Sequence, residues 1–362
     1  MQRFLAFLLI LLAIPGGHCA DAAAPAKPLP AAHIALLLPL DSASFGPAAD
    51  AVKQGFFAAS IMQAPAAPPL QVYPTGDRAE DIVSAYGQAL QAGAKVVVGP
   101  LTRNAVTALA KSGAVAVPTL ALNYPENDAP LPDNLYLFGL SAEGEAVQTA
   151  QLAFAEGRRS ALTVTANTPL AKRVEQAFAD AWVGLGGTLV AQTAFPADQT
   201  QFPALQETVL GHPADMIFLA ADAGRARLVR PYLDASKPTY ATSMVFDGNR
   251  EVSRNVDLNG IVFVEMPWLL QPDHPAVMAY PHIENLGIEQ QRLYALGVDA
   301  FRLAALMAQS PPVEGGVLDG VTGQIVLEGR QFQRQMTVAQ FRQGTAVAVE
   351  PAAPKQAGES PQ

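Results

Sequence analysis

Short apolar runs alternate with amphipathic stretches along most of this chain, and this rhythm limits the fold more than any other feature. Residues 33–39 form an apolar run typical of a strand buried on both faces, and residues 48–61 repeat apolar side chains at helical spacing. The pattern returns in strands at 70–73 and 95–98, with helices at 79–92 and 104–111. Alternation of this kind predicts βαβ crossovers and a parallel sheet.

The second half of the chain shows the same alternation, which predicts a second lobe. One more strand, at residues 115–120, is expected in the first lobe. In the second lobe, strands are expected at residues 160–165, 188–193, 215–219, 240–242 and 261–264, with further strands at 322–326 and 336–341 closing the chain. Helices are expected at residues 142–156, 170–185, 205–210, 221–233 and 294–308. The predicted fold class is therefore α/β, with two lobes that are each a parallel sheet flanked by helices.

The N-terminal segment resembles a secretory signal. A basic start at Arg3 precedes an apolar run at 4–14, and Pro15 then interrupts it. The run is too short to cross a bilayer as a helix. Residues 1–22 are predicted to be a signal peptide, followed by an Ala/Pro tether at 23–31, and residues 349–362 are predicted to be a disordered tail. We expect the mature protein in the periplasm.

Cys19 is the only cysteine, and it stands where a bacterial lipoprotein carries its acylated residue. His18 and Gly16 fit poorly around such a site, so ordinary cleavage after Ala22 is the alternative. Lipidation would make the protein an outer-membrane lipoprotein. Cleavage after Ala22 would leave no cysteine, and disulfides and thiolate metal sites would then be excluded.

Composition and motifs argue against several function classes. The net charge of −9 argues against a nucleic-acid partner or an anionic membrane, since both require a basic surface. No nucleophile elbow, phosphate loop or dinucleotide loop is present, and the five histidines do not have metal-ligand spacing. We therefore expect no cofactor, no metal site and no catalytic residues, and we predict that the protein is not an enzyme.

The loops at the carboxyl ends of the predicted strands are where a ligand would bind, in a cleft between the lobes. Thr102 opens a helix and could help to hold a carboxylate, although such a position also favours a plain N-cap. Asp222 is the candidate partner for an ammonium group, and Trp268 lies near an expected crossover between the lobes. The full set of cleft candidates is Ser42, Ser44, Gly99, Thr102, Asn123, Tyr124, Asn167, Asp222, Ser243 and Trp268.

Several short segments resemble the penicillin-binding-protein activator family and lie in the order of that family. They are residues 34–40, 55–56, 97–101, 120–123, 185–187, 240–243, 258–261, 265–267, 292–300 and 323–325. The run Tyr-Ala-Leu-Gly-Val-Asp-Ala within 292–300 is the most distinctive, whereas the Gly-Pro-Leu and Leu-Pro-Leu pieces also occur in amino-acid-binding proteins.

The resemblance implies a type I periplasmic-binding-protein fold with crossover strands between the lobes. Lobe 1 is then expected at residues 32–139 and about 266–312, and lobe 2 at 140–265 and about 313–348. It also implies a regulator that binds and activates a class A penicillin-binding protein in peptidoglycan synthesis, without turnover of its own. The best-known members carry a helical-repeat domain before the lobes, where this chain has only the tether.

The alternative function is a periplasmic solute-binding protein for an amino acid or a similar small polar ligand. Such a receptor needs several polar groups that converge on its ligand. The expected cleft loops contain Leu101, Ala121, Leu122 and Ala221, and this apolar set favours the regulator.

Overall fold

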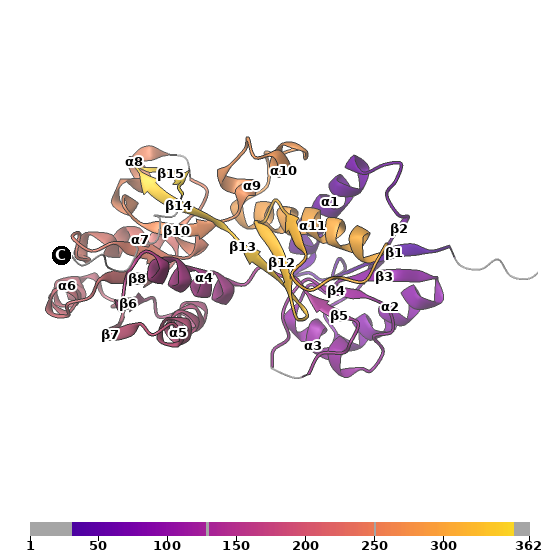
Figure 1. Ribbon diagram of the computed structural model, residues 1–362, viewed down its shortest axis with the longest axis horizontal. Coiled ribbons are helices and arrows are strands. Elements are labelled where there is room, and N and C mark those ends of the chain that lie inside the picture. The colour runs from indigo at the N-terminus through magenta and orange to yellow at the C-terminus, as the bar shows by residue number, and fades with distance from the viewer. Residues whose placement is uncertain (1–30, 128–129, 250, 351–362) are drawn as a thin grey trace, which may run out of the picture.

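The computed structural model describes residues 31–127, 130–249 and 251–350. The predicted signal peptide, Cys19, nearly all of the tether and most of the tail lie outside the described residues. Two lobes lie side by side along the long axis of the molecule, and each is a sheet flanked by helices (Figure 1). The predicted α/β fold class is thereby confirmed.

The first lobe contains an eight-stranded sheet in the order β11-β12-β13-β5-β4-β3-β1-β2. Its strands are β1 (His33–Leu38), β2 (Leu70–Pro74), β3 (Ala94–Val98), β4 (Thr119–Ala121), β5 (Leu135–Leu137), β11 (Val317–Asp319), β12 (Gln324–Glu328) and β13 (Gln331–Gln335). Every residue of β1 is buried, because Ile34, Leu36 and Leu38 contact one core while Ala35 and Leu37 contact the other. Helices α1 (Gly46–Met62) and α11 (Ile288–Met307) cover the first face, and α2 (Ala79–Gln91) and α3 (Arg103–Lys111) contribute to the cores of the opposite face.

The second lobe contains a seven-stranded sheet in the order β15-β14-β10-β9-β8-β6-β7. Its strands are β6 (Ser160–Thr165), β7 (Thr188–Ala194), β8 (Met216–Ala220), β9 (Thr239–Ala241), β10 (Val262–Glu265), β14 (Thr337–Arg342) and β15 (Thr345–Ala348). Its helices are α4 (Ala142–Ala155), α5 (Pro169–Gly184), α6 (Phe202–Gly211), α7 (Ala223–Val229) and α8 (Val252–Asn255). Phe178 stacks on Phe218 and on Trp182 in its core.

Short elements complete the chain between these units. Helices α9 (Pro267–Leu270) and α10 (Pro275–Met278) precede α11, and their residues Trp268 and Val277 belong to the core of the first lobe. Single 3-10 turns are η1 (Gln199–Gln201), η2 (Arg230–Tyr232), η3 (Ser243–Val245) and η4 (Val256–Leu258).

The chain crosses from one lobe to the other between β5 and α4, between β10 and α9, and between β13 and β14 (Figure 1). The expected assignment of residues from about 313 to 348 to lobe 2 is wrong for residues 313–335. Strands β11, β12 and β13 extend the first sheet, and β13 pairs in parallel with β5. The reason is packing, since Ile325, Leu327 and Phe332 belong to the core of the first lobe.

Two predicted elements have different bounds in the structure. Helix α11 begins at Ile288 rather than 294, because its polar first turn is capped: the Gly287 amide donates to Gln290 Oε1 over 3.1 Å. The strand expected at 115–120 pairs only from Thr119 onward. Pro118 carries no N–H, so a sheet hydrogen bond cannot be donated at that position.

Helices α1 and α11 approach each other through two glycines. A Cβ atom on Gly297 would overlap the backbone carbonyl of Val52, and one on Gly55 would overlap the carbonyl of Tyr294. Phe56 and Phe301 pack edge to face beside this contact, with ring centroids 5.2 Å apart. The two glycines therefore set how closely the helices pack.

Substituting Gly297 with Ala should destabilise the protein by about 1–3 kcal/mol, because the added methyl forces the two backbones apart. Chemical denaturation of the purified protein measures this change. Gly87 in α2 is the matched control, because a Cβ there meets nothing within 4 Å. Gly87→Ala should be neutral or stabilising by up to about 1 kcal/mol. Equal effects of the two substitutions would contradict the close-approach argument.

Candidate functional site at the junction of the lobes

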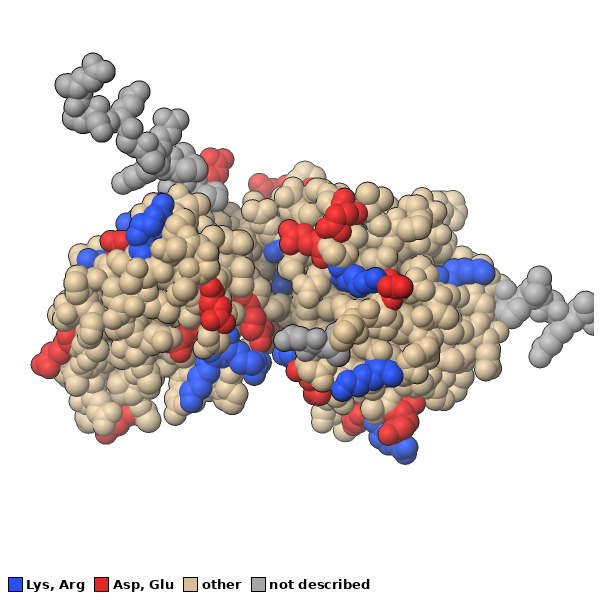
Figure 2. Space-filling model, turned by 60° about the horizontal axis from the view of Figure 1, so that its bottom comes forward, with Lys and Arg blue, Asp and Glu red and all other residues tan. Residues whose placement is uncertain are grey.

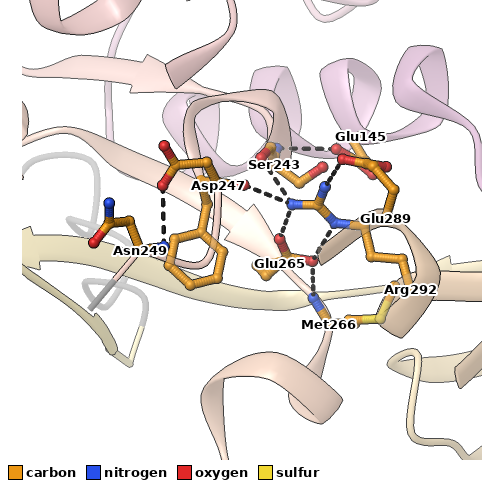
Figure 3. A network of polar contacts seen from close by, with 9 residues as sticks. Glu145, Ser243, Asp247, Asn249, Glu265, Met266, Glu289 and Arg292 are labelled. Carbon is orange, nitrogen blue, oxygen red and sulfur yellow. Dashed lines mark hydrogen bonds and ion pairs between the residues drawn. The ribbon is translucent and has the colours of Figure 1, made fainter. Parts of the chain in front are cut away.

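A buried ion pair joins the two lobes. Arg292 on α11 donates from Nη2 to Glu265 Oε2 at the end of β10, over 2.5 Å (Figure 3). Glu265 is fully buried, and Arg292 is 7% exposed. Arg292 comes from an element of the first lobe and Glu265 from a strand of the second, so the pair fixes the position of one lobe relative to the other.

The guanidinium of Arg292 donates hydrogen bonds to several acceptors among the described residues. Its Nη2 also donates to the carbonyls of Ser243 (3.1 Å) and Phe246 (2.9 Å), and its Nη1 donates to Glu289 (Figure 3). Glu145 Oε2 accepts the Ser243 amide over 3.0 Å and so holds the same loop against α4. This matters because a buried charge is tolerated only when it is paired and hydrogen-bonded.

Electrostatics couple Arg292 and Glu265 closely. Burial raises the pKa of the Glu265 carboxyl, while the Arg292 guanidinium and the Met266 amide act to lower it. Burial acts to lower the pKa of Arg292, but the carboxylates of Glu265 and Glu289 outweigh this effect and raise it. Each partner therefore favours the charged form of the other.

A second buried acid sits further along α11. Asp299 is fully buried and accepts the amides of Val321 (3.1 Å) and Thr322 (2.8 Å), the Thr322 hydroxyl (2.7 Å) and Arg302 Nη1 (3.1 Å). Burial raises the pKa of Asp299, and these donors oppose the shift. Asp299 thus ties α11 to the turn before β12.

Charged side chains gather in the groove between the lobes on the face shown in Figure 2. At the junction, Glu143 at the start of α4 lies 2.9 Å from Arg173 of α5 and 3.9 Å from Arg103 of α3. Burial acts to raise the pKa of Glu143, but its hydrogen bonds and the charges of Arg173 and Arg103 together outweigh burial and lower the pKa. All three side chains are partly exposed, so these pairs contribute little to stability.

The predicted cleft residues of the first lobe mostly make internal contacts. Ser42 is buried, and its hydroxyl accepts the Phe45 amide over 2.8 Å, whereas Ser44 is exposed. Gly99 has a φ of 107° and lies so close to β1 that a Cβ would overlap the Leu37 carbonyl. Thr102 precedes α3, but its side chain makes no capping hydrogen bond, so the plain N-cap interpretation is wrong in that respect.

Asn123 and Tyr124 follow β4 and pack against the same lobe. Asn123 donates from Nδ2 to the Leu101 carbonyl over 2.9 Å, and its Oδ1 accepts the Tyr124 amide. Burial raises the pKa of Tyr124, whose ring lies beside Gly139. The Asn123 amide is therefore already committed within the chain.

In the second lobe, Asn167 is exposed and Ser243 is buried in the Arg292 network. Asp222 caps α7 by accepting the Arg225 amide over 3.0 Å, and it also pairs with the Arg225 side chain. It lines one hollow of about 600 Å³ at the ends of β7 and β8.

Trp268 lines a different hollow of about 600 Å³, together with Phe246, Asp247 and His282. It is only 2% exposed, stacks on His282 at 4.2 Å between centroids and donates from Nε1 to Gln291. Trp268 and Asp222, which we expected to face one cleft, therefore line separate hollows.

The residues that build the junction, Arg292, Glu265 and Glu145, were not among the predicted site residues. A signal was available, because Arg292 interrupts the apolar helix at the start of the most distinctive run and Glu265 directly ends an apolar strand. Within residues 31–127, 130–249 and 251–350, no three His, Cys, Asp or Glu side chains are grouped as metal ligands would be. No helix in that part of the chain is long and apolar enough to cross a membrane.

Comparison with known proteins gives one family. The model described as "LppC putative lipoprotein" matches residues 27–344. The penicillin-binding protein activator LpoA of Edwardsiella piscicida is 30% identical over 323 residues, which cover 78% of this chain and 46% of that protein. The Escherichia coli K12 protein of the same name is 27% identical over 77% of this chain and 47% of its own length. The chain thus spans about half the length of these curated relatives.

Solved structures give the same picture. The LpoA C-domain of Haemophilus influenzae, described as a regulator of PBP1A, has a TM-score of 0.75 and 26% identity, covering 88% of this chain and 100% of that chain. A Chromobacterium violaceum protein described as a "putative branched-chain amino acid ABC transporter" has a TM-score of 0.75 and 36% identity, covering 86% of this chain and 100% of that chain.

Replacing Arg292 with Met should destabilise the protein by about 3–5 kcal/mol at neutral pH, because Glu265 is left buried without its partner. Loss of the guanidinium should raise the pKa of Glu265 further. A carboxyl whose pKa is higher in the folded than in the unfolded state destabilises the folded state as the pH rises above 4.5, the ordinary pKa of a glutamate carboxyl. Denaturant unfolding at about pH 4 and about pH 7 should therefore show the larger loss at the higher pH.

The double variant Arg292→Met with Glu265→Leu is the matched control, since it removes both charges together. It should recover most of the lost stability, because an apolar pair of similar size can replace a buried ion pair. A double variant as unstable as Arg292→Met would contradict the assigned role of the pair.

Proposed function

This chain belongs to the LppC lipoprotein family, and from that premise we propose that it is a non-catalytic envelope protein that binds and activates a class A penicillin-binding protein. The observation that carries the proposal is the match to the Haemophilus influenzae C-domain, which this chain covers over its full length. That domain is the one described as a regulator of PBP1A. We extend the role in peptidoglycan synthesis to this chain because of that correspondence.

The state of the predicted cleft supports regulation by protein contact over capture of a solute. The Ser42 hydroxyl and the Asn123 side chain are bonded within the chain, and the backbone of the buried Ser243 is bonded to Glu145 and Arg292. A solute receptor needs such groups to face its ligand. The Arg292–Glu265 pair also holds the lobes together through a buried contact, which suits a body that offers a constant surface to a partner.

One comparison favours a second function. The Chromobacterium violaceum protein, whose description refers to branched-chain amino acid transport, is 36% identical and fully covered. A solute-binding role in transport is therefore the alternative. In that case, a small polar solute should raise the melting temperature of the protein. At solute concentrations above its Kd, the rise should be proportional to the logarithm of the concentration.

The activator role predicts that the purified protein, residues 23–362, accelerates glycan polymerisation or cross-linking by a class A penicillin-binding protein in a saturable manner. A pull-down from envelope extract, probed with a fluorescent penicillin, should retain that synthase, and untagged protein should compete for it. Heat-denatured protein is the control. No retention above a mock resin, together with an unchanged rate, would rule out the activator role, and a thermal-shift screen with amino acids would then test the alternative.

We further propose that Cys19 is the lipid attachment site, because the family is described as a lipoprotein family. In cells fed labelled palmitate, the wild-type protein should carry label and fractionate with membranes. Cys19→Ser should lose the label and move to the soluble periplasmic fraction. Identical behaviour of the two proteins would instead support ordinary cleavage after Ala22.

A further inference from the structure

A hollow of about 600 Å³ lies at the carboxyl ends of β7 and β8 in the second lobe. The segment after β7, the start of α7 and one residue of α8 form its walls. All of its lining residues belong to the second lobe, so the hollow does not depend on closure of the lobes. The lining residues are Phe195, Ala197, Gln199, Phe202, Asp222, Gly224, Arg225, Arg227, Leu228 and Arg254.

One wall of this hollow is basic. Arg227 is fixed in place, since its Nη2 donates over 2.8 Å to both Asp247 Oδ2 and Asn255 Oδ1. The Nε of Arg227 is buried and has no partner among the described residues. Arg225 pairs with Asp222, while Arg254 is exposed and makes no ion pair within the described part of the chain. Three guanidinium groups thus line one hollow, although the net charge of the protein is −9.

The other wall is apolar. Phe195 and Phe202 meet edge to face with centroids 5.2 Å apart, and Leu228 is 46% exposed. A ligand that fills the hollow would therefore place an apolar group against these side chains and an anionic group against the arginines.

The net charge around the hollow favours an anion with a single negative charge. Among the lining residues and their ion-pair partners, the carboxylates of Asp222 and Asp247 balance two of the three arginines, which leaves one net positive charge. A carboxylate carries a single negative charge, whereas a phosphate monoester carries nearly two at neutral pH. The planar guanidinium fork also matches a carboxylate through two parallel hydrogen bonds.

We propose that this hollow binds a carboxylate that carries an aromatic or branched apolar group. The carboxylate comes either from a free small acid or from the C-terminal residue of a peptide. The site is separate from the buried Arg292 network, and it does not rest on the activator role.

Titration of the purified protein with 3-phenylpropionate, followed by NMR, tests the proposal. The acid should bind saturably with a Kd at or below about 10 mM, a range typical of so small a ligand. Its neutral amide, which lacks the charge, and acetate, which lacks the apolar group, should each bind at least about tenfold more weakly. Added salt should weaken binding of the acid.

The double variant Arg225→Ala with Arg254→Ala should weaken binding of 3-phenylpropionate by at least about tenfold, and Arg254→Glu should act in the same direction. Arg342→Ala is the matched control. Arg342 is an exposed arginine of the same lobe, on β14 at the other side of the sheet from β7, so its loss should leave binding unchanged. Circular dichroism verifies that each variant is folded, and Arg227 is left intact because it holds Asp247 and Asn255.

A peptide that ends in a phenylalanine carboxylate, compared with its C-terminal amide, distinguishes the two sources. Tighter binding of the peptide acid than of 3-phenylpropionate would identify a chain terminus as the natural ligand, and the reverse order would identify a free acid. The proposal is overturned if the acid does not bind up to about 10 mM, if acid and amide bind equally, or if the double variant binds like Arg342→Ala.

Discussion

The Arg292–Glu265 pair is the interaction on which the arrangement of the two lobes depends. Burying two charges is costly, and the arrangement persists only because Arg292 finds further acceptors at Ser243, Phe246 and Glu289. Glu289 lies on α11 itself, but Glu265 at the end of β10 and the turn at 243–246 belong to the second lobe, so these bonds are satisfied in one relative position of the lobes. A rotation of one lobe would leave a buried guanidinium or carboxylate unpaired, at an expected penalty of several kcal/mol.

Helix α11 carries this pair together with two other contacts, which explains why the run at 292–300 is so distinctive. Gly297 allows α1 to approach, and Asp299 accepts the amides of Val321 and Thr322. Arginine, glycine and aspartate thus occur within eight residues of one helix for three separate structural reasons. The segment that carries the clearest resemblance to the family is therefore a structural element that joins the lobes, and this resemblance does not by itself locate a binding surface.

The sequence predicted the parallel core well, because strands buried on both faces are apolar throughout, as residues 33–38 show. The prediction was wrong for residues 313–335, because strand β13 reads Gln-Phe-Gln-Arg-Gln and buries only Phe332. Such a strand carries no strong apolar signal, and its place in the first sheet follows from pairing with β5, which is distant in sequence. The residues of the junction were not predicted because Glu145, Glu265 and Arg292 are distant in sequence and converge only after both lobes fold.

A fixed junction has a consequence for what the molecule can do. A receptor that closes on its ligand needs lobes that rotate, and its affinity depends on groups brought together by that closure. Here a buried ion pair lies beside the crossover from β10 to α9, and cleft candidates such as Ser42, Asn123 and Ser243 are bonded within the chain. The arginine hollow is lined by the second lobe alone, so it could bind a carboxylate without any movement of the first. Recognition by a surface that does not depend on closure of the lobes is therefore the mode that this architecture favours.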